Sequence, residues 1–386
     1  MIGTAADGPL LLMTPGPTRV PERVLRAGAR PMIHHRTPEF SRELATVIEL
    51  LAPLFGTRGK TMPVHTTGRG ALEATICNLL SPGDELAACC NGKFGEMWAE
   101  IAESYGVVVH RWSTSWERNA DPAELDALLA EHPRTRAVTV AYGDTSTGVA
   151  NDVAAVARVA RAHDALLLVD AVSTLGGMPF SFDEWEVDVA VTASQKCLMS
   201  STGLAFVALS DRAWKATETS RLPANYWRFD AIRDSISRPK PETPGSTPVH
   251  LVLQVAEALR MIHEEGLPAV LDRHAAMASR TREAARELGL EMQCPELELR
   301  SATLTAIALP ADVSPKAFRD AIKARGVLTA AGLGRFESCG FRIGHMGDIR
   351  MGDVERTLAA VEEALRSAGD RRWAMGDGRR ATRASS

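Results

Sequence analysis

The sequence predicts an α/β protein that has a mainly parallel sheet in a large domain, followed by a smaller α+β domain. Short apolar runs alternate with stretches of helical periodicity between about residues 62 and 192. Such alternation is typical of a mainly parallel sheet covered by helices on both faces. A chain of 386 residues is also long for a single core, which suggests two domains.

The chain opens with a segment that we expect to be extended, because TPGPT at 14–18 places two prolines around a glycine. A helical pattern follows at about 40–55. The next strands are expected at 62–65, 85–90, 106–111, 136–142, 165–170 and 187–192. The helices between them are expected at 70–80, 95–105, 122–131 and 152–163.

A seventh strand is expected at 204–210, and its short connection to the strand before it favours antiparallel pairing. The proline-rich stretch 220–248 is expected to be a long functional or interface loop. Two helices, 248–266 and 267–288, lead to a region with strands at 302–308 and 341–344 and helices at 315–324 and 352–367. The expected division is an N-terminal arm (1–20), a large domain (21–265), a small domain (266–368) and a disordered tail (369–386).

Composition argues against several classes of partner. The formal net charge is only −4, and no basic run is interleaved with aromatic residues, so neither nucleic acid nor a membrane surface is an expected partner. No apolar run is long enough to span a membrane, and the start of the chain does not resemble a signal peptide. The six cysteines show neither metal-site spacing nor a disulfide framework, so we expect no metal site and a reducing, cytoplasmic location.

Lys196 is the most informative residue of the chain. It follows an apolar strand in the string VTASQKC, and a second apolar run ends at Asp170, 26 residues earlier. A lysine amine forms an imine with the aldehyde of pyridoxal phosphate (PLP), while a carboxylate keeps the pyridine nitrogen of that cofactor protonated. The protonated ring is an electron sink for a substrate carbanion. The pair therefore predicts PLP as cofactor, with Ser194 and Gln195 just before the lysine as neighbouring contacts.

Three other segments place suitable groups after strands of the same sheet, where ligands of parallel α/β sheets collect. HTTGRGALEA at 65–74 reads as a strand end, a turn and a helix start, which is an anion site, so Thr67, Gly68 and Arg69 are the expected phosphate binders. Phe94, in NGKFGE, is a candidate to stack on the pyridine ring. Thr145, in YGDTSTGV, is a candidate to bind the ring hydroxyl.

The string GFRIGHMGD at 340–348 offers a substrate contact in the small domain. Arginine binds a carboxylate through two parallel hydrogen bonds that lysine cannot reproduce. Amino acids and 2-oxo acids share that carboxylate, so Arg342 is expected to serve both. Arg335 is a second candidate anion contact, which would admit a dicarboxylate donor.

Taken together, these strings resemble the class V branch of the fold type I PLP-dependent aminotransferases, and most of all the alanine–glyoxylate and serine–glyoxylate (or serine–pyruvate) enzymes. The matching strings occur in family order over roughly residues 10–368: TPGPT, HTTGRGALEA, NGKFGE, STGV, LLLVDAVSTLGG, SQK, STPV and RIGHMG. The resemblance implies a seven-stranded sheet and transfer of an amino group from a small amino acid, of the alanine or serine type, to glyoxylate or pyruvate.

The resemblance also implies a homodimer whose two active sites lie at the interface. In the family a loop of the partner subunit reaches the phosphate, which carries over to Ser246 and Thr247 here. Thr243 stands where a tyrosine is often found, Arg69 where the family often has histidine, and Phe94 where it often has tryptophan or tyrosine.

Several alternatives remain open at the level of sequence. Ureidoglycine–glyoxylate and 2-aminoethylphosphonate aminotransferases share the framework, and so does a pyridoxamine–pyruvate aminotransferase, although the intact phosphate turn argues against it. A cysteine desulfurase would need a mobile nucleophilic cysteine, and Cys339 lacks a Gly/Ser-rich flap. A non-catalytic binding module is disfavoured because Lys196 is present. The sequence does not name the amino donor.

Overall fold

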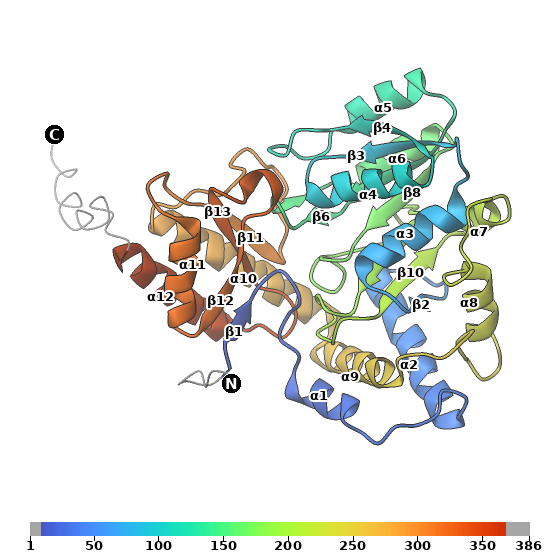
Figure 1. Ribbon diagram of the computed structural model, residues 1–386, viewed down its shortest axis with the longest axis horizontal. Coiled ribbons are helices and arrows are strands. Elements are labelled where there is room, and N and C mark those ends of the chain that lie inside the picture. The colour runs from blue at the N-terminus through green and yellow to red at the C-terminus, as the bar shows by residue number, and fades with distance from the viewer. Residues whose placement is uncertain (1–8, 368–386) are drawn as a thin grey trace.

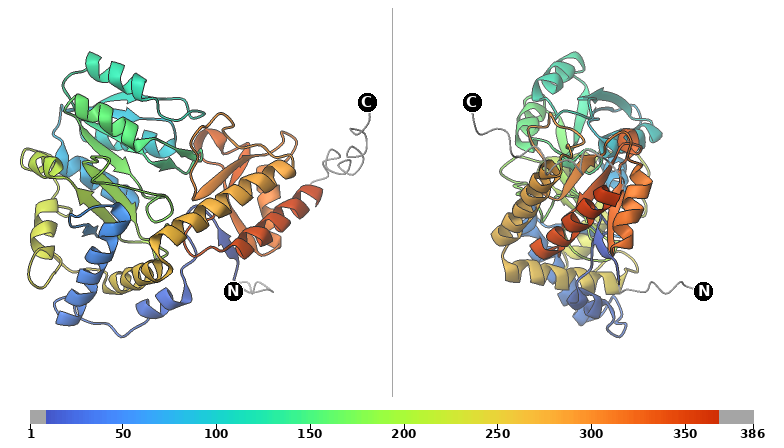
Figure 2. Two further views of the ribbon diagram at one scale, coloured as in Figure 1. Left: turned by 180° about the vertical axis from the view of Figure 1, so that it is seen from behind. Right: turned by 90° about the vertical axis from the view of Figure 1, so that its left-hand side faces the viewer.

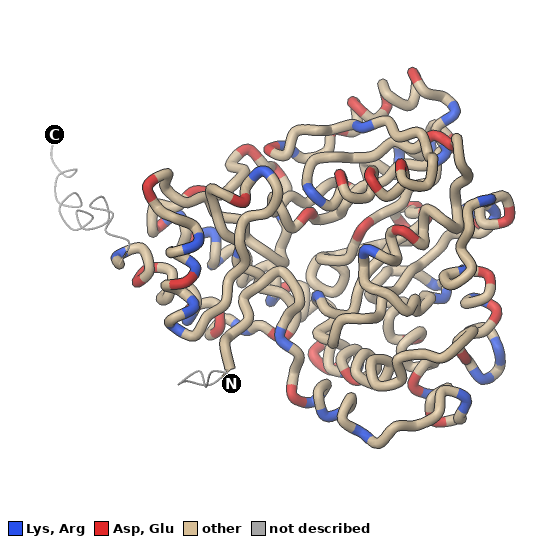
Figure 3. The backbone as a smooth tube through the Cα atoms, in the orientation of Figure 1, with Lys and Arg blue, Asp and Glu red and all other residues tan. Residues whose placement is uncertain are grey.

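The computed structural model describes residues 9–367 of the chain, which form two sheets with separate hydrophobic cores (Figure 1). The expected tail at 369–386 and the first eight residues of the expected arm lie outside the described residues. Within 9–367, no helix has both the length and the apolar character needed to cross a membrane. Acidic and basic residues are interspersed over the helices around both sheets (Figure 3).

The larger sheet has seven strands, in the spatial order β2-β10-β9-β8-β5-β3-β4. Along the chain the strands are β2 (Met62–Val64), β3 (Glu85–Cys89), β4 (Val108–Trp112), β5 (Thr135–Ala141), β8 (Leu166–Asp170), β9 (Val189–Ala193) and β10 (Ala205–Leu209). All neighbours are parallel except that β10 is antiparallel to both β9 and β2, as the short connection before it predicts. The mainly parallel α/β class is thereby confirmed.

Helices cover both faces of this sheet. Helices α3 (Gly68–Leu79) and α4 (Lys93–Ser104) pack on one face, while α5 (Pro122–Glu131) and α6 (Val153–Ala162) pack on the other (Figures 1 and 2). Beyond the β2 side lie α1 (Glu22–Gly28), α2 (Pro38–Phe55), α8 (Phe229–Ile236) and α9 (Val249–Glu265), while α7 (Asp211–Thr217) packs against α3 and β10. The strands are buried along most of their length, which explains why they read as continuous apolar runs rather than as alternating ones.

The smaller sheet has four strands, in the order β1-β12-β13-β11. They are β1 (Leu11–Met13), β11 (Leu304–Ala308), β12 (Val327–Ala331) and β13 (Gly340–Gly344). Helices α10 (Leu267–Glu287), α11 (Pro315–Ala324) and α12 (Met351–Ser367) flank it (Figure 2). The N-terminal strand β1 pairs in parallel with β12, so the first described residues of the chain belong to this sheet. A two-stranded hairpin, β6 (Gly143–Asp144) and β7 (Val149–Ala150), follows β5.

One expectation about the fold needs correction. Residues 220–248 are not wholly irregular, because they contain helix α8. Phe229, Ile232 and Ile236 are buried at helical spacing on one side of this helix. Flanking prolines and charges masked this short apolar stripe in the sequence, and burial against the large core stabilises the helix in spite of them.

Candidate active site

A cavity of about 190 Å³ opens at the carboxyl edge of the large sheet. Five strands that point the same way end there, so residues far apart in the sequence meet at one place. The lining residues are Thr67, Gly68, Arg69, Leu72, Phe94, Met97, Gly143, Thr145, Asp170, Val172, Ser173, Gln195 and Lys196. Eight of the predicted site residues are in this set: those of the phosphate turn, Phe94, Thr145, Asp170, Gln195 and Lys196.

Lys196 lies in a tight turn after β9 with its side chain in the cavity wall. Its amine donates a hydrogen bond to the carbonyl of Pro15. Removal of the amine from water lowers its pKa to about 8, and the nearby charge of Asp170 opposes this shift. About a tenth of the amine is therefore neutral at pH 7, far more than for an ordinary lysine, and the neutral form is the one that attacks an aldehyde.

The N-terminal segment closes over this lysine. The Thr18 N–H donates to the carbonyl of Gln195 at 3.1 Å, and the Thr18 hydroxyl donates to the carbonyl of Lys196 at 3.1 Å. A Cβ at Gly16 would lie 2.5 Å from the lysine nitrogen, so only glycine permits this close approach. The string TPGPT thus packs against the lysine turn.

Asp170 is the last residue of β8 and is buried. One of its oxygens, Oδ1, accepts a hydrogen bond from the Val172 N–H at 2.8 Å. Burial raises the pKa of its carboxyl to about 7, assisted by the neighbouring charge of Asp144. Within residues 9–367 it forms no ion pair, so the buried carboxyl has room for a cationic ligand.

The turn at the start of α3 is open to an anion. Thr67 is the N-cap residue, yet its side chain makes no capping hydrogen bond. The first N–H groups of the helix and the positive end of its dipole are therefore oriented for a phosphate beside Arg69. A Cβ at Gly68 would lie 2.9 Å from the side chain of Val172, so glycine allows the helix to approach the strand that carries Asp170.

Arg342 lies in β13 of the small sheet, beside the cavity. Its guanidinium donates to the carbonyl of Ala331 at 2.7 Å and to the carbonyl of Thr145 at 2.9 Å. Burial lowers its pKa to about 10, and the charge of Asp144 opposes this shift. No carboxylate of the described chain pairs with this guanidinium, so its charge is available to an anionic ligand.

The structure does not bring every predicted residue to the cavity. The Ser194 hydroxyl donates to the carbonyl of Ser201 at 2.7 Å, behind the lysine turn. Arg335 is mostly exposed, pairs with Glu96 at 3.2 Å and stacks over the ring of Trp116.

Ser246 and Thr247 also lie outside the cavity formed by their own chain. Ser246 lines a separate surface pocket of about 390 Å³ next to His65. The Thr247 hydroxyl bonds to Nε2 of that histidine at 2.7 Å.

Asp144 is a site residue that sequence reasoning missed. It is fully buried beneath the cavity wall, and its two oxygens accept from the N–H groups of Phe94, Gly95 and Ser146 and from the Ser146 hydroxyl. The available signal was an acidic residue after a strand, the same signal that identifies Asp170. The sequence reasoning instead selected the neighbouring hydroxyl residue Thr145 in YGDTSTGV.

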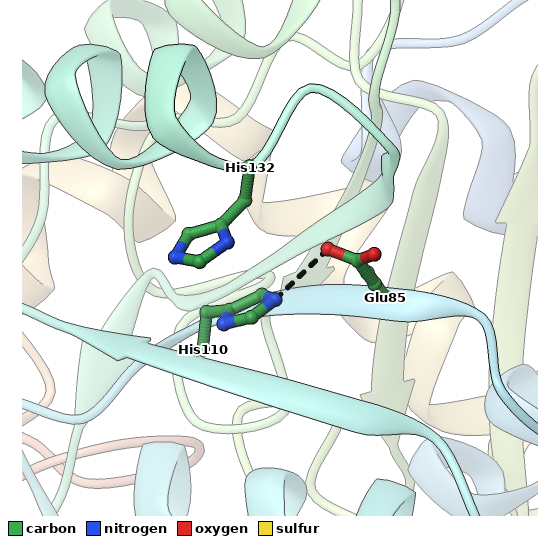
Figure 4. Close-up of side chains that lie close together, drawn as sticks. All are labelled: Glu85, His110 and His132. Atoms are coloured by element: carbon green, nitrogen blue, oxygen red, sulfur yellow. Dashed lines mark hydrogen bonds and ion pairs between the residues drawn. The ribbon is translucent and has the colours of Figure 1, made fainter.

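A cluster of potential metal ligands lies far from this cavity, near the amino end of β3. Glu85, His110 and His132 bring one ligand atom each to within 4.8 Å of the others (Figure 4). The two imidazole rings stack with centroids 3.7 Å apart and an angle of 14° between their planes. Their lone pairs therefore run nearly parallel and do not converge on one point. Glu85 pairs with Arg134 through its other oxygen, so the cluster is best described as an ion-pair network.

The donor set of the cavity fits PLP. It combines an amine of lowered pKa, a buried carboxyl without a cation, an uncapped helix start and the buried Gln195 Oε1, which has no hydrogen-bond partner among the described residues. A mainly parallel seven-stranded sheet with this lysine and aspartate at its strand ends is the fold type I arrangement of PLP-dependent transferases.

Within that class the chain belongs to the aminotransferase class-V family, whose pattern matches residues 11–351. It is therefore an aminotransferase, and membership of this family implies the use of PLP.

Known relatives match along nearly the whole chain. The chain is 37% identical to a protein named soluble hydrogenase, small subunit, from Synechococcus sp. (strain PCC 6716), over 95% of this chain and 96% of that protein. It is 34% identical to serine–glyoxylate aminotransferase of Methylorubrum extorquens, over 95% and 93%. It is 35% identical to L-aspartate–glyoxylate aminotransferase of Paracoccus denitrificans, over 93% and 91%.

Solved structures agree with this assignment. Alanine–glyoxylate aminotransferase from Nostoc sp. superimposes with a TM-score of 0.88 at 29% identity, over 95% of this chain and 97% of that one. Pyridoxamine–pyruvate aminotransferase from Mesorhizobium loti superimposes with a TM-score of 0.89 at 29% identity, over 96% and 95%.

Proposed function

We propose that this protein is a PLP-dependent aminotransferase that moves an amino group from a small amino acid, of the alanine or serine type, to glyoxylate or pyruvate. The observation that carries the proposal is the meeting of Lys196 and Asp170 in one cavity with an open helix start. Relatives named for glyoxylate as acceptor support the choice of substrate.

In this proposal each part of the cofactor has a residue suited to it. Thr67, Gly68 and Arg69 bind the phosphate at the start of α3. Asp170 faces the ring nitrogen, and burial among apolar groups makes the pairing of opposite charges strong there.

Phe94 would stack on one face of the pyridine ring, and Thr145 would form a hydrogen bond with the ring hydroxyl. When bound, PLP supplies the electron sink that lets the Cα–H bond of an amino acid break.

The chain itself supplies the base and the substrate anchor. Lys196, with its pKa near 8, takes the proton from Cα of the bound amino acid once its amine is free. Arg342 orients the substrate through its α-carboxylate, and the two carbonyls that hold the guanidinium fix the direction of its fork. Both half-reactions use the same anchor, because the amino acid and the 2-oxo acid carry the same carboxylate.

We further propose that the protein acts as a homodimer in which Ser246 and Thr247 reach the phosphate of the partner subunit. Their place outside the cavity of their own chain supports this proposal. Tyr226 lines the same surface pocket as Ser246 and is 71% exposed in the single chain, so its ring is accessible to a second subunit. A cytoplasmic location is also proposed, on the basis of the six free cysteines.

Two other activities receive less support. The hydrogenase name of one relative is not transferred to this chain, because the only group of three or more metal-ligand residues found within 9–367 contains no cysteine. A desulfurase is disfavoured because Cys339 is exposed and does not line the cavity.

Ureidoglycine–glyoxylate and 2-aminoethylphosphonate transamination are further candidates, and the former is the named reaction of a relative that is 28% identical.

The test is a panel of amino donors, with glyoxylate and pyruvate as acceptors, assayed on the purified protein supplied with PLP. We expect alanine or serine to change the absorbance spectrum of the bound cofactor in the absence of an acceptor. Glyoxylate or pyruvate should then restore the original spectrum. Pyridoxamine and (S)-ureidoglycine belong in the same panel as competing donors. Turnover with either of them but not with alanine or serine would replace the proposed substrate class.

A further inference from the structure

We propose that Asp144 is a positioning residue. It acts as a clamp that holds Phe94, in the wall of the cofactor cavity, to the loop at residues 144–146, which binds Arg342. The proposal rests on the proposed function, since it assigns a role to the wall and to the arginine. It concerns a side chain that does not line the cavity and acts only through its neighbours.

The clamp begins at the start of α4, the helix that carries Phe94. Its N-cap residue is Gly92, which has no side chain to satisfy the free N–H groups of the first turn. Asp144 does this from another strand end, because Oδ2 accepts from the Phe94 N–H at 2.8 Å and from the Gly95 N–H at 3.3 Å. The Ser146 hydroxyl oxygen accepts from the Lys93 N–H at 2.9 Å. The first turn is thus capped entirely by residues 144–146.

Space for the carboxylate depends on the glycine. A Cβ at Gly92 would lie 2.2 Å from the carboxyl carbon of Asp144, which is closer than any real contact. Glycine at the cap and aspartate on the neighbouring loop are therefore complementary. A larger residue at position 92 would collide with Asp144, and without Asp144 the N–H groups of Phe94 and Gly95 would lose their acceptor.

Burial raises the pKa of the Asp144 carboxyl, and the hydrogen bonds that it accepts oppose this shift by stabilising the ionised form. Besides the two amides of α4, Oδ1 accepts from the Ser146 N–H at 2.8 Å and from the Ser146 hydroxyl at 2.6 Å. All four neighbours are donors, and a protonated carboxyl would direct its own hydrogen against one of them. The negative charge lies at the positive end of the α4 dipole, where it is most stable.

The other side of the clamp is the Thr145 carbonyl. It lies between two residues bound to α4 and accepts from the guanidinium of Arg342 at 2.9 Å. The position of that carbonyl is consequently fixed by the same carboxylate that fixes Phe94. One buried charge thereby sets the relative position of the cofactor wall on the large sheet and the substrate anchor on the small one.

The test compares Asp144→Asn with Asp188→Asn in the full-length chain. Asp188 is a matched control, because it is equally buried and accepts from the Leu167 N–H at 2.9 Å, the Ser210 hydroxyl at 2.7 Å and Arg212 at 3.1 Å, none of which lines the cavity. Three quantities are measured: thermal stability, amide hydrogen exchange of residues 92–97, and affinity for PLP by fluorescence titration together with the circular dichroism of the bound cofactor. A third variant, Ser146→Ala, keeps the charge and removes one donor.

We expect Asp144→Asn to accelerate exchange in residues 92–97, to weaken PLP binding by about tenfold or more, and to reduce the circular dichroism of the cofactor. Asp188→Asn should lower stability without changing the other two quantities, and Ser146→Ala should fall between Asp144→Asn and the parent. The proposal is overturned if Asp144→Asn only loses stability as the control does, or if exchange rises while PLP binding stays at the parent level. A parent protein that binds no PLP would instead overturn the proposed function, because the exchange data still report on the clamp.

Discussion

At the scale of single residues, burial moves the pKa values of Asp170 and Lys196 toward each other. Asp170 and Lys196 are ordinary side chains at strand ends, yet removal from water brings their pKa values to about 7 and about 8. The sequence identified both residues from their place after apolar runs. It did not reveal the shifts, which depend on how the rest of the chain excludes water.

The lowered pKa of Lys196 predicts how PLP uptake depends on pH. Below pH 8 the amine is mostly protonated and cannot attack the aldehyde, so the uptake rate of cofactor-free protein should rise about tenfold per pH unit and level off above pH 8. Stopped-flow absorbance from pH 6 to 10 measures this rate, with N-acetyl-lysine amide as the unperturbed amine. A rate that keeps rising to pH 10, as for the free amine, would mean that burial does not lower the pKa.

The substrate anchor is tested by Arg342→Lys, which keeps the charge but loses the fork. We expect affinity for alanine, serine, glyoxylate and pyruvate to weaken together, by about 2 kcal/mol or more. Arg335→Lys is the control, because Arg335 pairs with Glu96 outside the cavity. Apparent affinities for the four compounds with each variant decide the matter. Loss of affinity in the Arg335 variant alone would exchange the two assignments.

Arg335 and Asp144 illustrate what sequence reasoning missed at this scale. Both candidate arginines, Arg335 and Arg342, stand in or near the RIGHMG string, but only the structure shows that Arg335 is held by Glu96 and Trp116. Asp144 is hard to identify from the sequence because two of its partners are backbone N–H groups about 50 residues away in sequence. Contacts of this kind depend on how strand ends meet, and residue types do not encode them locally.

At the scale of helices and strands, the long apolar patterns were reliable and the short ones were not. All seven strands of the large sheet were expected near their observed places, because burial on both faces makes them continuously apolar. Strands β1, β6, β7 and β12 and helices α1, α7 and α8 were missed. Each is short, and tertiary pairing stabilises it more than local propensity does, as in the parallel pairing of β1 with β12.

The start of α4 gives a prediction at this scale. Gly92→Ala should destabilise the protein by about 1–3 kcal/mol, because the added methyl group collides with the Asp144 carboxyl. Gly352→Ala in α12 is the control, since a Cβ there meets nothing within 4 Å and alanine favours helix. Urea unfolding of both variants measures the difference. Equal stability of the two would show that the cap of α4 adapts without cost.

At the scale of the whole molecule, residues around the large sheet line the cavity, and Arg342 of the small sheet bonds to the Thr145 carbonyl in its wall. The expected boundary between a large domain (21–265) and a small one (266–368) stays a proposal, and Gly266 between α9 and α10 is its natural place. The arm proposed at 1–20 contributes β1 to the small sheet and its next residues to the lysine turn. It therefore links the two parts of the chain directly, which the sequence did not suggest.

The proposed shared sites of a dimer can be tested by mixing inactive subunits. Lys196→Ala subunits and subunits with Ser246→Ala and Thr247→Ala should each be nearly inactive alone. In a mixed dimer, one site would combine an intact lysine with an intact loop from the partner subunit. Unfolding and refolding the two together in equal amounts should therefore restore about a quarter of the parent activity. No recovery, with both variants folded, would indicate that the loop serves its own subunit.

We propose that one lysine, Lys196, carries PLP in this chain. The protein is saturated with PLP, reduced with borohydride, digested and mapped by mass spectrometry, with Lys93→Ala as a control for a lysine close to the site. We predict that one peptide, containing Lys196, gains the reduced cofactor in both the parent and the control, and that Lys196→Ala gains none. Attachment at another lysine of the parent, or none at full PLP supply, would contradict the account.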